Sequence, residues 1–288
     1  MKETGKETYP KLNNMESDTQ FLIDIVLRAS DIARQPFAIA QKDKGGDLVT
    51  TADLEMERFM IREIETHYPD FDVISEEFNP TNKLTPNCFI IDPLDGTINF
   101  AHGLPLWGIQ VAMVRKGKIC GSVIYLPDMS ELYFADKTGA YVTGVACATL
   151  RKDGGTPHKN NSTDKTVPRT SNKFHSIIST ATPISVNKNT PDKVLYLVEG
   201  GDKFPALRRM NIRSRHWRYF CCTAVNSAWT ASGKLGGTIL RKDNLWDYVP
   251  GQYLVEMAGG VVINRKGAHI AAGTKQLARL LLKDGRIE

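Results

Sequence analysis

A short apolar run followed at once by two aspartates and a glycine is the feature that most restricts how this chain can fold. Cys88-Phe89-Ile90-Ile91 is short, apolar and partly β-branched, which is typical of a buried strand. The hexapeptide Asp92-Pro93-Leu94-Asp95-Gly96-Thr97 follows directly, so two carboxylates leave the strand end beside a glycine where the backbone can turn. Hard divalent cations prefer clustered oxygen ligands, and phosphates prefer free backbone N–H groups. The segment therefore predicts a site for metal-assisted phosphoryl chemistry.

The composition is ordinary for a soluble globular protein. The 288 residues are 41% hydrophobic and 24% charged, which suits one large domain or two modest ones. No apolar stretch approaches the roughly 20 residues of a membrane-spanning helix, and the polar N-terminus lacks an apolar signal region. Five cysteines without a CxxC pair indicate reduced thiols, and the net charge of +5 is too small to argue for nucleic-acid binding. We expect a cytoplasmic protein without a membrane or nucleic-acid partner.

The first third of the sequence predicts two helices and a strand ahead of the hexapeptide. We expect residues 1–16 to form a disordered leader. A helix follows from Ser17-Asp18-Thr19-Gln20, which matches a helix capping box. A second helix begins after Asp47-Leu48-Val49-Thr50, and residues 71–74 predict a strand that delivers Ser75-Glu76-Glu77.

An antiparallel meander is predicted after the hexapeptide, and strands mixed with helices are predicted in the second half. Turn sequences separate four β-segments, near residues 107–114, 118–126, 131–135 and 140–143. In the second half, strands are predicted at 175–180 and 261–264, and helices after Thr190-Pro191, at 220–232, after Asp247 and at 274–283. We divide the chain into a leader, an N-terminal α+β part that binds metal and phosphate, a polar loop, and a C-terminal α/β part that completes the site: 1–16, 17–148, 149–174 and 175–288.

Four acidic residues stand at predicted strand ends or helix starts: Glu76, Asp92, Asp95 and Asp247. Ligands bind at strand ends in layered α/β structures, and three or four carboxylates suit Mg²⁺ or Mn²⁺. Two such ions about 4 Å apart would clamp a phosphate and activate a water for in-line attack. Alternatively, these acids only cap strands and helices. Taken alone, Glu76 and Asp247 fit that interpretation better, whereas Asp92 and Asp95 beside Gly96-Thr97 favour the metal site.

Three further candidates each have a structural explanation as well as a functional one. Asp53 lies in the first turn of a predicted helix, where the helix dipole favours a carboxylate; paired with a threonine hydroxyl, it could instead relay a proton from a metal-bound water. Arginines between residues 208 and 218 suit phosphate, although a solvated or ion-paired face is the favoured interpretation. Cys221-Cys222 stands at a helix start, where we expect packed rather than reactive thiols.

Taken together, these segments resemble the inositol monophosphatase family. The matching pieces follow the family's order and spacing: Asp47-Leu48-Val49-Thr50-Thr51-Ala52-Asp53, Ser75-Glu76-Glu77, the stretch from Asp92 to Phe100, and Trp246-Asp247 through Ala258-Gly259-Gly260. The likeness covers roughly residues 18–145 and 219–288 and is weak between them. It implies a layered αβαβα sandwich, like that of inositol monophosphatase and fructose-bisphosphatase. It also implies a homodimer with Mg²⁺-dependent, lithium-sensitive phosphomonoesterase activity, with Mn²⁺ as an alternative cofactor.

The resemblance also implies which residues hold the metal. Glu76, Asp92 and Asp95, together with the carbonyl of Leu94, would hold one ion, and Asp95 and Asp247 would hold a second. These same two aspartates would also face the substrate.

Water and phosphate are assigned in the same way. Glu76 and Thr97, with Asp53 behind Thr97, would orient the attacking water. The backbone N–H groups of Gly96 and Thr97 would hold the phosphate, and no covalent enzyme intermediate is expected.

The departures from the family pattern fall where the alcohol would be recognised. Cys221-Cys222-Thr223-Ala224 stands where the family often has Gly-[Ser/Thr]-Ala-Ala, Gly236 replaces a frequent aspartate, and Leu240 lies where inositol-specific members carry a substrate-contacting glutamate. Inositol monophosphate is the first substrate candidate. The alternatives are 3′(2′),5′-bisphosphate nucleotides, fructose 1,6-bisphosphate and histidinol phosphate. A different class, a non-catalytic regulator that binds protein or RNA, also stays open.

Overall fold

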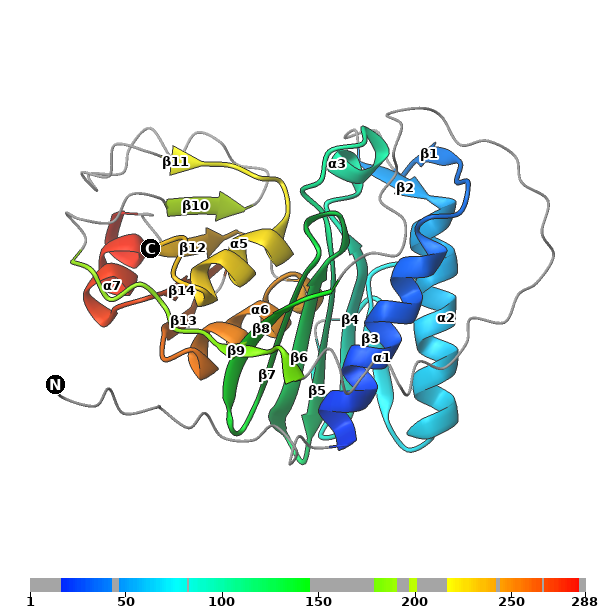
Figure 1. The fold of residues 1–288 in the computed structure, drawn as a ribbon, viewed down its shortest axis with the longest axis horizontal. Helices are drawn as coiled ribbons and strands as arrows, with labels where there is room; N and C mark the ends of the chain where they lie inside the picture. Colours follow the sequence, from blue (N-terminus) through cyan, green and yellow to red (C-terminus); the bar gives the residue numbers. More distant parts are fainter. Residues whose placement is uncertain are drawn as a thin grey trace, which may run out of the picture.

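The computed structural model describes residues 17–42, 47–81, 83–145, 179–190, 197–200, 217–241, 244–265 and 267–284. These residues form five layers: a helix pair, a seven-stranded sheet, a second helix pair, a five-stranded sheet and a last helix (Figure 1). This is the αβαβα sandwich that the resemblance implied. The predicted leader, the polar loop, the helix after Thr190-Pro191 and the arginines before Arg218 lie outside the described residues, as do the predicted boundaries at 148–149 and 174–175.

The outer helix layer consists of α1 (Ser17–Ile32) and α2 (Thr51–His67), which lie side by side on one face of the first sheet (Figure 1). Each helix buries apolar side chains at helical spacing, among them Leu22, Ile25, Met56 and Met60. Both helices agree with the sequence prediction. A two-stranded sheet of β1 (Ile39–Gln41) and β2 (Leu48–Thr50) leads into α2.

The first sheet contains the predicted meander. β3 pairs with β4 in parallel, and each later neighbour pairs antiparallel, in chain order. Side chains alternate between faces, so that Phe89 and Ile91 pack under α1 and α2 while Ile90 packs on the opposite side. The strands are β3 (Asp72–Ser75), β4 (Cys88–Asp95), β5 (Gly108–Arg115), β6 (Lys118–Leu126), β7 (Glu131–Asp136), β8 (Gly139–Gly144) and β9 (Thr182–Pro183).

β4 runs further than the sequence suggested. We expected the strand to end at Ile91, but it continues to Asp95, and the pairing with β5 shifts register between Asp92 and Asp95. Pro93 has no N–H to donate to a ladder, and a bulge is where a strand tolerates proline. The two aspartates are therefore held within an irregular strand end, and the short helix α3 (Thr97–Ala101) follows.

The second helix pair lies between the two sheets. α5 (Thr223–Ala231) and α6 (Leu245–Met257) bury residues such as Val225 and Leu254 against Ile124 and Leu126 of the first sheet. As the sequence predicted, α5 ends just before Gly233. The φ of Gly233 is +75°, which glycine adopts readily and other residues do not. α6 begins at Leu245, so that Asp247 lies inside its first turn rather than ahead of it.

The second sheet has the strand order β11-β10-β12-β14-β13, and α7 (Lys275–Asp284) covers it (Figure 1). Its strands are β10 (Leu197–Gly200), β11 (Trp217–Arg218), β12 (Gly237–Leu240), β13 (Val261–Arg265) and β14 (Ala268–Ala272). The strand predicted at 175–180 lies mostly outside the described residues, and Ser179 and Thr180 belong to no strand. None of the described helices combines the length and the apolar character needed to cross a bilayer.

Candidate active site

A cavity of about 170 Å³ opens where β3, β4 and β12 end and α5 and α6 begin. It is lined by all four predicted acidic residues: Glu76, Asp92, Asp95 and Asp247. Three of them, Asp92, Asp95 and Asp247, are buried and offer carboxylate oxygens that lie within 4.8 Å of one another. Carboxylates this close repel one another unless protons or a cation neutralise them, and an all-oxygen donor set suits a hard divalent cation.

Asp95 is fixed by the N-terminus of α5. Its Oδ2 accepts hydrogen bonds from the backbone N–H of Ala224 at 2.5 Å, the hydroxyl of Thr223 at 3.0 Å and the thiol of Cys222 at 3.1 Å. The first N–H groups of a helix lack partners within the helix, so the carboxylate caps α5. Because all three bonds go to Oδ2, Oδ1 is the oxygen that can face a cation. Burial raises the pKa of Asp95, while these hydrogen bonds oppose the rise.

Asp92 is the most enclosed carboxylate of the site. Only 1% of the residue is exposed, and the backbone N–H of Leu94 donates to its Oδ1 at 3.2 Å. Burial raises its pKa well above the usual range, and the nearby charges of Glu76, Asp95 and Asp247 add to the rise. A bound cation would reverse this balance, because it favours the charged form of each carboxylate that faces it.

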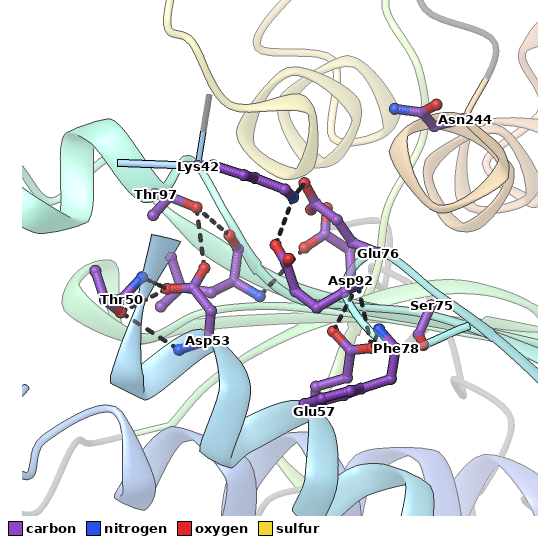
Figure 2. A network of polar contacts seen from close by, with 12 residues as sticks. Lys42, Thr50, Asp53, Glu57, Ser75, Glu76, Phe78, Asp92, Thr97 and Asn244 are labelled. Carbon is purple, nitrogen blue, oxygen red and sulfur yellow. Dashed lines mark hydrogen bonds and ion pairs between the residues drawn. The ribbon is translucent and has the colours of Figure 1, made fainter. Parts of the chain in front are cut away.

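The two remaining acids approach the cavity from different elements. Asp247, in the first turn of α6, accepts a hydrogen bond from the Asn244 side chain at 3.1 Å. Glu76 follows β3 and pairs with Lys42, whose Nζ lies 2.9 Å from Glu76 Oε1 and 2.6 Å from Glu77 Oε1 (Figure 2). Glu76 thus lines the cavity with the aspartates, but its carboxylate is turned toward an ammonium group.

Asp53 and Thr97 meet although 44 residues separate them in the chain. The Thr97 hydroxyl donates to Asp53 Oδ1 at 3.0 Å and lies 3.1 Å from the carbonyl oxygen of Leu94 (Figure 2). Asp53 Oδ2 accepts from the N–H and the hydroxyl of Thr50 at 2.8 and 2.5 Å. The Asp53 N–H donates to the Thr50 hydroxyl oxygen at 3.3 Å, which completes a capping box at the start of α2. Burial raises the pKa of Asp53 to about 6. The sequence offered helix capping and pairing with a threonine hydroxyl as alternatives for Asp53. In the structure Asp53 does both.

Gly96 allows the chain to turn between the two halves of the motif. Its φ is +86°, and a Cβ at this position would lie 2.9 Å from the carbonyl oxygen of Leu106 and 3.2 Å from Cys222 Cβ. Both the left-handed backbone and the lack of space therefore require glycine. Gly96 and Thr97 line the cavity at this turn.

Two buried polar residues that support the site were missed by the sequence analysis. Glu57 on α2 accepts hydrogen bonds from the N–H groups of Glu77 and Phe78, at 3.1 and 2.8 Å, and so holds the turn that carries Glu76 (Figure 2). Gln110 on β5 is fully buried and stands opposite Asp92. A single polar residue on an apolar helix face or inside an apolar strand is the signal that could have identified both.

The cavity also has apolar lining residues, which we call the apolar wall. Leu48, Ile98, Tyr219 and Leu240 line it together with Cys221. Ile98 and Tyr219 are large hydrophobic residues that stay exposed to solvent, 44% and 37% respectively. Leu240 ends β12 and is buried. The cavity is therefore lined both by carboxylates, which we call its acidic end, and by the apolar wall.

Known proteins share both the sequence pattern and the fold. A model of the inositol monophosphatase family matches residues 14–287. The fructose-1,6-bisphosphatase/inositol-1-monophosphatase of Thermotoga maritima is 29% identical over 232 residues, which cover 80% of this chain and 76% of that protein. Inositol-1-monophosphatase ImpA of Mycolicibacterium smegmatis is 28% identical over 278 residues, covering 91% and 89%. A solved structure of Thermotoga maritima IMPase matches the fold with a TM-score of 0.69 at 23% identity, covering 93% of this chain and 94% of that one.

Proposed function

The chain belongs to the inositol monophosphatase family, a metal-dependent phosphomonoesterase family, and we propose that it hydrolyses a small phosphorylated alcohol at the acidic end of the cavity. The observation that carries this proposal is the cluster of three buried aspartates with oxygens within 4.8 Å of one another. Buried carboxylates at this spacing are costly without a cation, and the cavity beside them is open to a ligand.

The donor set fits Mg²⁺, with Mn²⁺ as an alternative, because every donor is a hard oxygen. Asp92, Asp95 and Asp247 would hold the metal, with Glu76 and the carbonyl of Leu94 as further ligands. The ion would lower the pKa of a bound water and offset charge on the phosphate. Lys42 pairs with Oε1 of Glu76, so its ammonium group would compete with a cation for this carboxylate.

Thr97, Asp53 and Glu76 would orient the attacking water. The Thr97 hydroxyl has one hydrogen, which points to either Asp53 or the Leu94 carbonyl, so its lone pairs can accept a hydrogen bond from water. Asp53 holds Thr97 in place and can accept its proton. The N–H groups of Gly96 and Thr97 would bind phosphate oxygens, and water would attack without a covalent enzyme intermediate.

For the alcohol we propose inositol monophosphate as the first candidate, because relatives that match most of this chain carry inositol-1-monophosphatase names. The apolar wall favours a second candidate. Leu240 and Ile98 cannot hydrogen-bond the hydroxyls of a polyol, whereas Tyr219 offers a face on which a flat ring could stack. A nucleotide such as a 3′(2′),5′-bisphosphate fits that wall better than inositol does. Fructose 1,6-bisphosphate and histidinol phosphate remain alternatives.

A phosphate-release assay across these four substrate types, with Mg²⁺ and with or without Li⁺, tests the proposal. We expect Mg²⁺-dependent release from at least one substrate, and inhibition by Li⁺. A clear preference for the nucleotide would replace inositol monophosphate as the substrate. Absence of release from every substrate, despite measurable Mg²⁺ binding, would instead support the non-catalytic regulator.

The homodimer implied by the resemblance and the cytoplasmic location expected from the composition belong to the same proposal. Light scattering on the purified protein should give twice the mass of the 32.1 kDa chain. A mass of one chain would contradict the dimer without affecting the chemistry of the cavity.

A further inference from the structure

We propose that Gln110 and Thr223 form a hydrogen-bonded link that positions Asp92 and Asp95 relative to each other for metal binding. The inference rests on the proposed function, because it takes both aspartates as metal ligands. Gln110 and Thr223 are not ligands themselves: neither offers a carboxylate, and Gln110 does not line the cavity. They are positioning residues, and each acts through an aspartate.

The link connects Asp92 to Asp95 through two side chains. Gln110 is directly opposite Asp92 in the β4–β5 ladder, so its side chain lies on the same face as the Asp92 carboxylate and its amide can donate to that carboxylate. Gln110 Nε2 also donates to the Thr223 hydroxyl at 3.0 Å. Thr223 in turn donates to Asp95 Oδ2 at 3.0 Å. One amide has two hydrogens and one hydroxyl has a single hydrogen, so the donors suffice for the bonds to Thr223 and Asp95 and for one more from Gln110 to Asp92.

The bulge in β4 explains why such a link is useful. Asp92 pairs with Gln110 and Asp95 pairs with Gly108, so three steps along β4 oppose two steps along β5. The ladder is therefore irregular between the two aspartates, and backbone pairing alone fixes their separation poorly. The side-chain link spans this irregular interval and also ties it to the start of α5, where Ala224 binds the same carboxylate.

The unpaired oxygen of Gln110 supports this interpretation. Gln110 is fully buried, and its Oε1 has no hydrogen-bond partner among the described residues. A buried acceptor without a partner is destabilising. Turning the amide over would place Oε1 against the Thr223 hydroxyl, whose hydrogen already goes to Asp95. The structure thus keeps Nε2 on Thr223 at the expense of Oε1.

Thr223→Val is the sharpest test, because it removes the hydroxyl and keeps the shape of the side chain. We expect the dissociation constant for Mn²⁺, measured by titration calorimetry on the full chain, to rise about 10- to 100-fold, as is typical when a partner of a metal ligand is lost. Thr223→Ser keeps the hydroxyl and should bind Mn²⁺ within about threefold of the wild type. High Mn²⁺ should restore most of the activity of Thr223→Val, because the ligands themselves remain.

Thr230→Val is the matched control. Thr230 lies on the same helix, is fully buried, and donates only to the carbonyl of Asn226 within the helix, at 2.8 Å. This variant should lose thermal stability to a similar degree but keep the Mn²⁺ affinity of the wild type. Gln110→Leu should weaken Mn²⁺ binding as Thr223→Val does. The double variant should weaken it by less than the product of the two single fold-changes, because both substitutions break the same link.

Unchanged Mn²⁺ affinity in folded Thr223→Val would overturn the link, as would an equal loss in Thr230→Val. Should Gln110→Leu fail to fold, the comparison of Val and Ser at position 223 still decides. Asp95→Asn separates this outcome from failure of the proposed function: wild-type affinity for Mn²⁺ in Asp95→Asn would mean that the aspartates do not hold the metal at all.

Discussion

The acidic end of the cavity and its apolar wall are built in different ways. Asp92, Asp95 and Asp247 are at most 8% exposed, and hydrogen bonds from the backbone or side chains fix their carboxylates. In the apolar wall, Ile98 and Tyr219 are exposed by 44% and 37%. Buried, hydrogen-bonded groups have one geometry, whereas exposed side chains can adjust to the molecule they contact. The comparison suggests that the chemistry is fixed by the acidic end and that the choice of alcohol is left to the wall.

Asp95→Asn should produce the largest effect at the acidic end. The amide keeps the shape of the side chain but removes the negative charge that attracts the cation. We expect kcat with Mg²⁺ to fall by about three orders of magnitude, since metal stabilisation of the transition state contributes several kcal/mol. Thermal unfolding without metal should show an unchanged or higher Tm, because repulsion among buried carboxylates decreases. Retention of wild-type kcat would show that Asp95 does not support turnover.

Thr97→Val is expected to have the next largest effect. It removes the hydroxyl that contacts Asp53 and Leu94 while preserving the β-branched shape. A positioned proton-transfer group contributes about 10²- to 10⁴-fold, so kcat should fall within this range while KM changes little. Thr97→Ser is the control and should keep most of the activity. If the serine and valine variants are equally slow, the hydroxyl is not the relevant feature.

The stability of the metal-free protein should depend on pH through Asp53, which contacts Thr97 of the cavity. Burial raises the pKa of Asp53 to about 6 in the folded state, from an ordinary value of 3.8. The folded state therefore holds more protons than the unfolded state between about pH 4 and pH 6, and stability falls as the pH rises through this window. Above this window, the ionised Asp53 lowers the free energy of unfolding by about 3 kcal/mol relative to its value below the window.

Denaturant unfolding of the wild type and Asp53→Asn in EDTA measures this contribution. The difference between their unfolding free energies should change with pH across that window and become constant above it. A difference that does not change between pH 4 and pH 7 would contradict the raised pKa.

Leu240→Gln should have the smallest effect, confined to the wall. A hydrogen-bonding side chain at the end of β12 should favour polyol substrates, so we expect kcat/KM for inositol monophosphate to rise about tenfold relative to the nucleotide. The affinity for Mn²⁺ should stay unchanged. Leu240→Met keeps the side chain apolar and should leave the ratio of the two kcat/KM values unchanged. A loss of Mn²⁺ affinity in Leu240→Gln would mean that the wall and the acidic end are not independent.

The elements that the sequence predicted well are those with local signals. The helices α1 and α2 have apolar residues at helical spacing, and β5 to β8 are separated by clear turn sequences. β12 and β14 were missed because Gly237 and the alanines of β14 have low strand propensity. Their pairing with each other, in a buried sheet, overrides this preference.

The candidate site shows the same division. The motif residues could be named from the sequence, since the family pattern places them. The partners of these residues depend on contacts between distant segments: Lys42 with Glu76, Gln110 with Thr223, and Thr223 with Asp95. No periodicity or spacing along the chain encodes such contacts. The register shift in β4 was missed for the same reason, because it is a property of pairing with β5.

The most direct test of the central claim is the anomalous diffraction of a crystal of this protein soaked in Mn²⁺. The account predicts an anomalous peak bounded by the carboxylates of Asp92, Asp95 and Asp247, within about 2.5 Å of an oxygen of each. An active protein whose Mn²⁺ peak lies elsewhere, or that shows no peak among these three aspartates at saturating Mn²⁺, would contradict it.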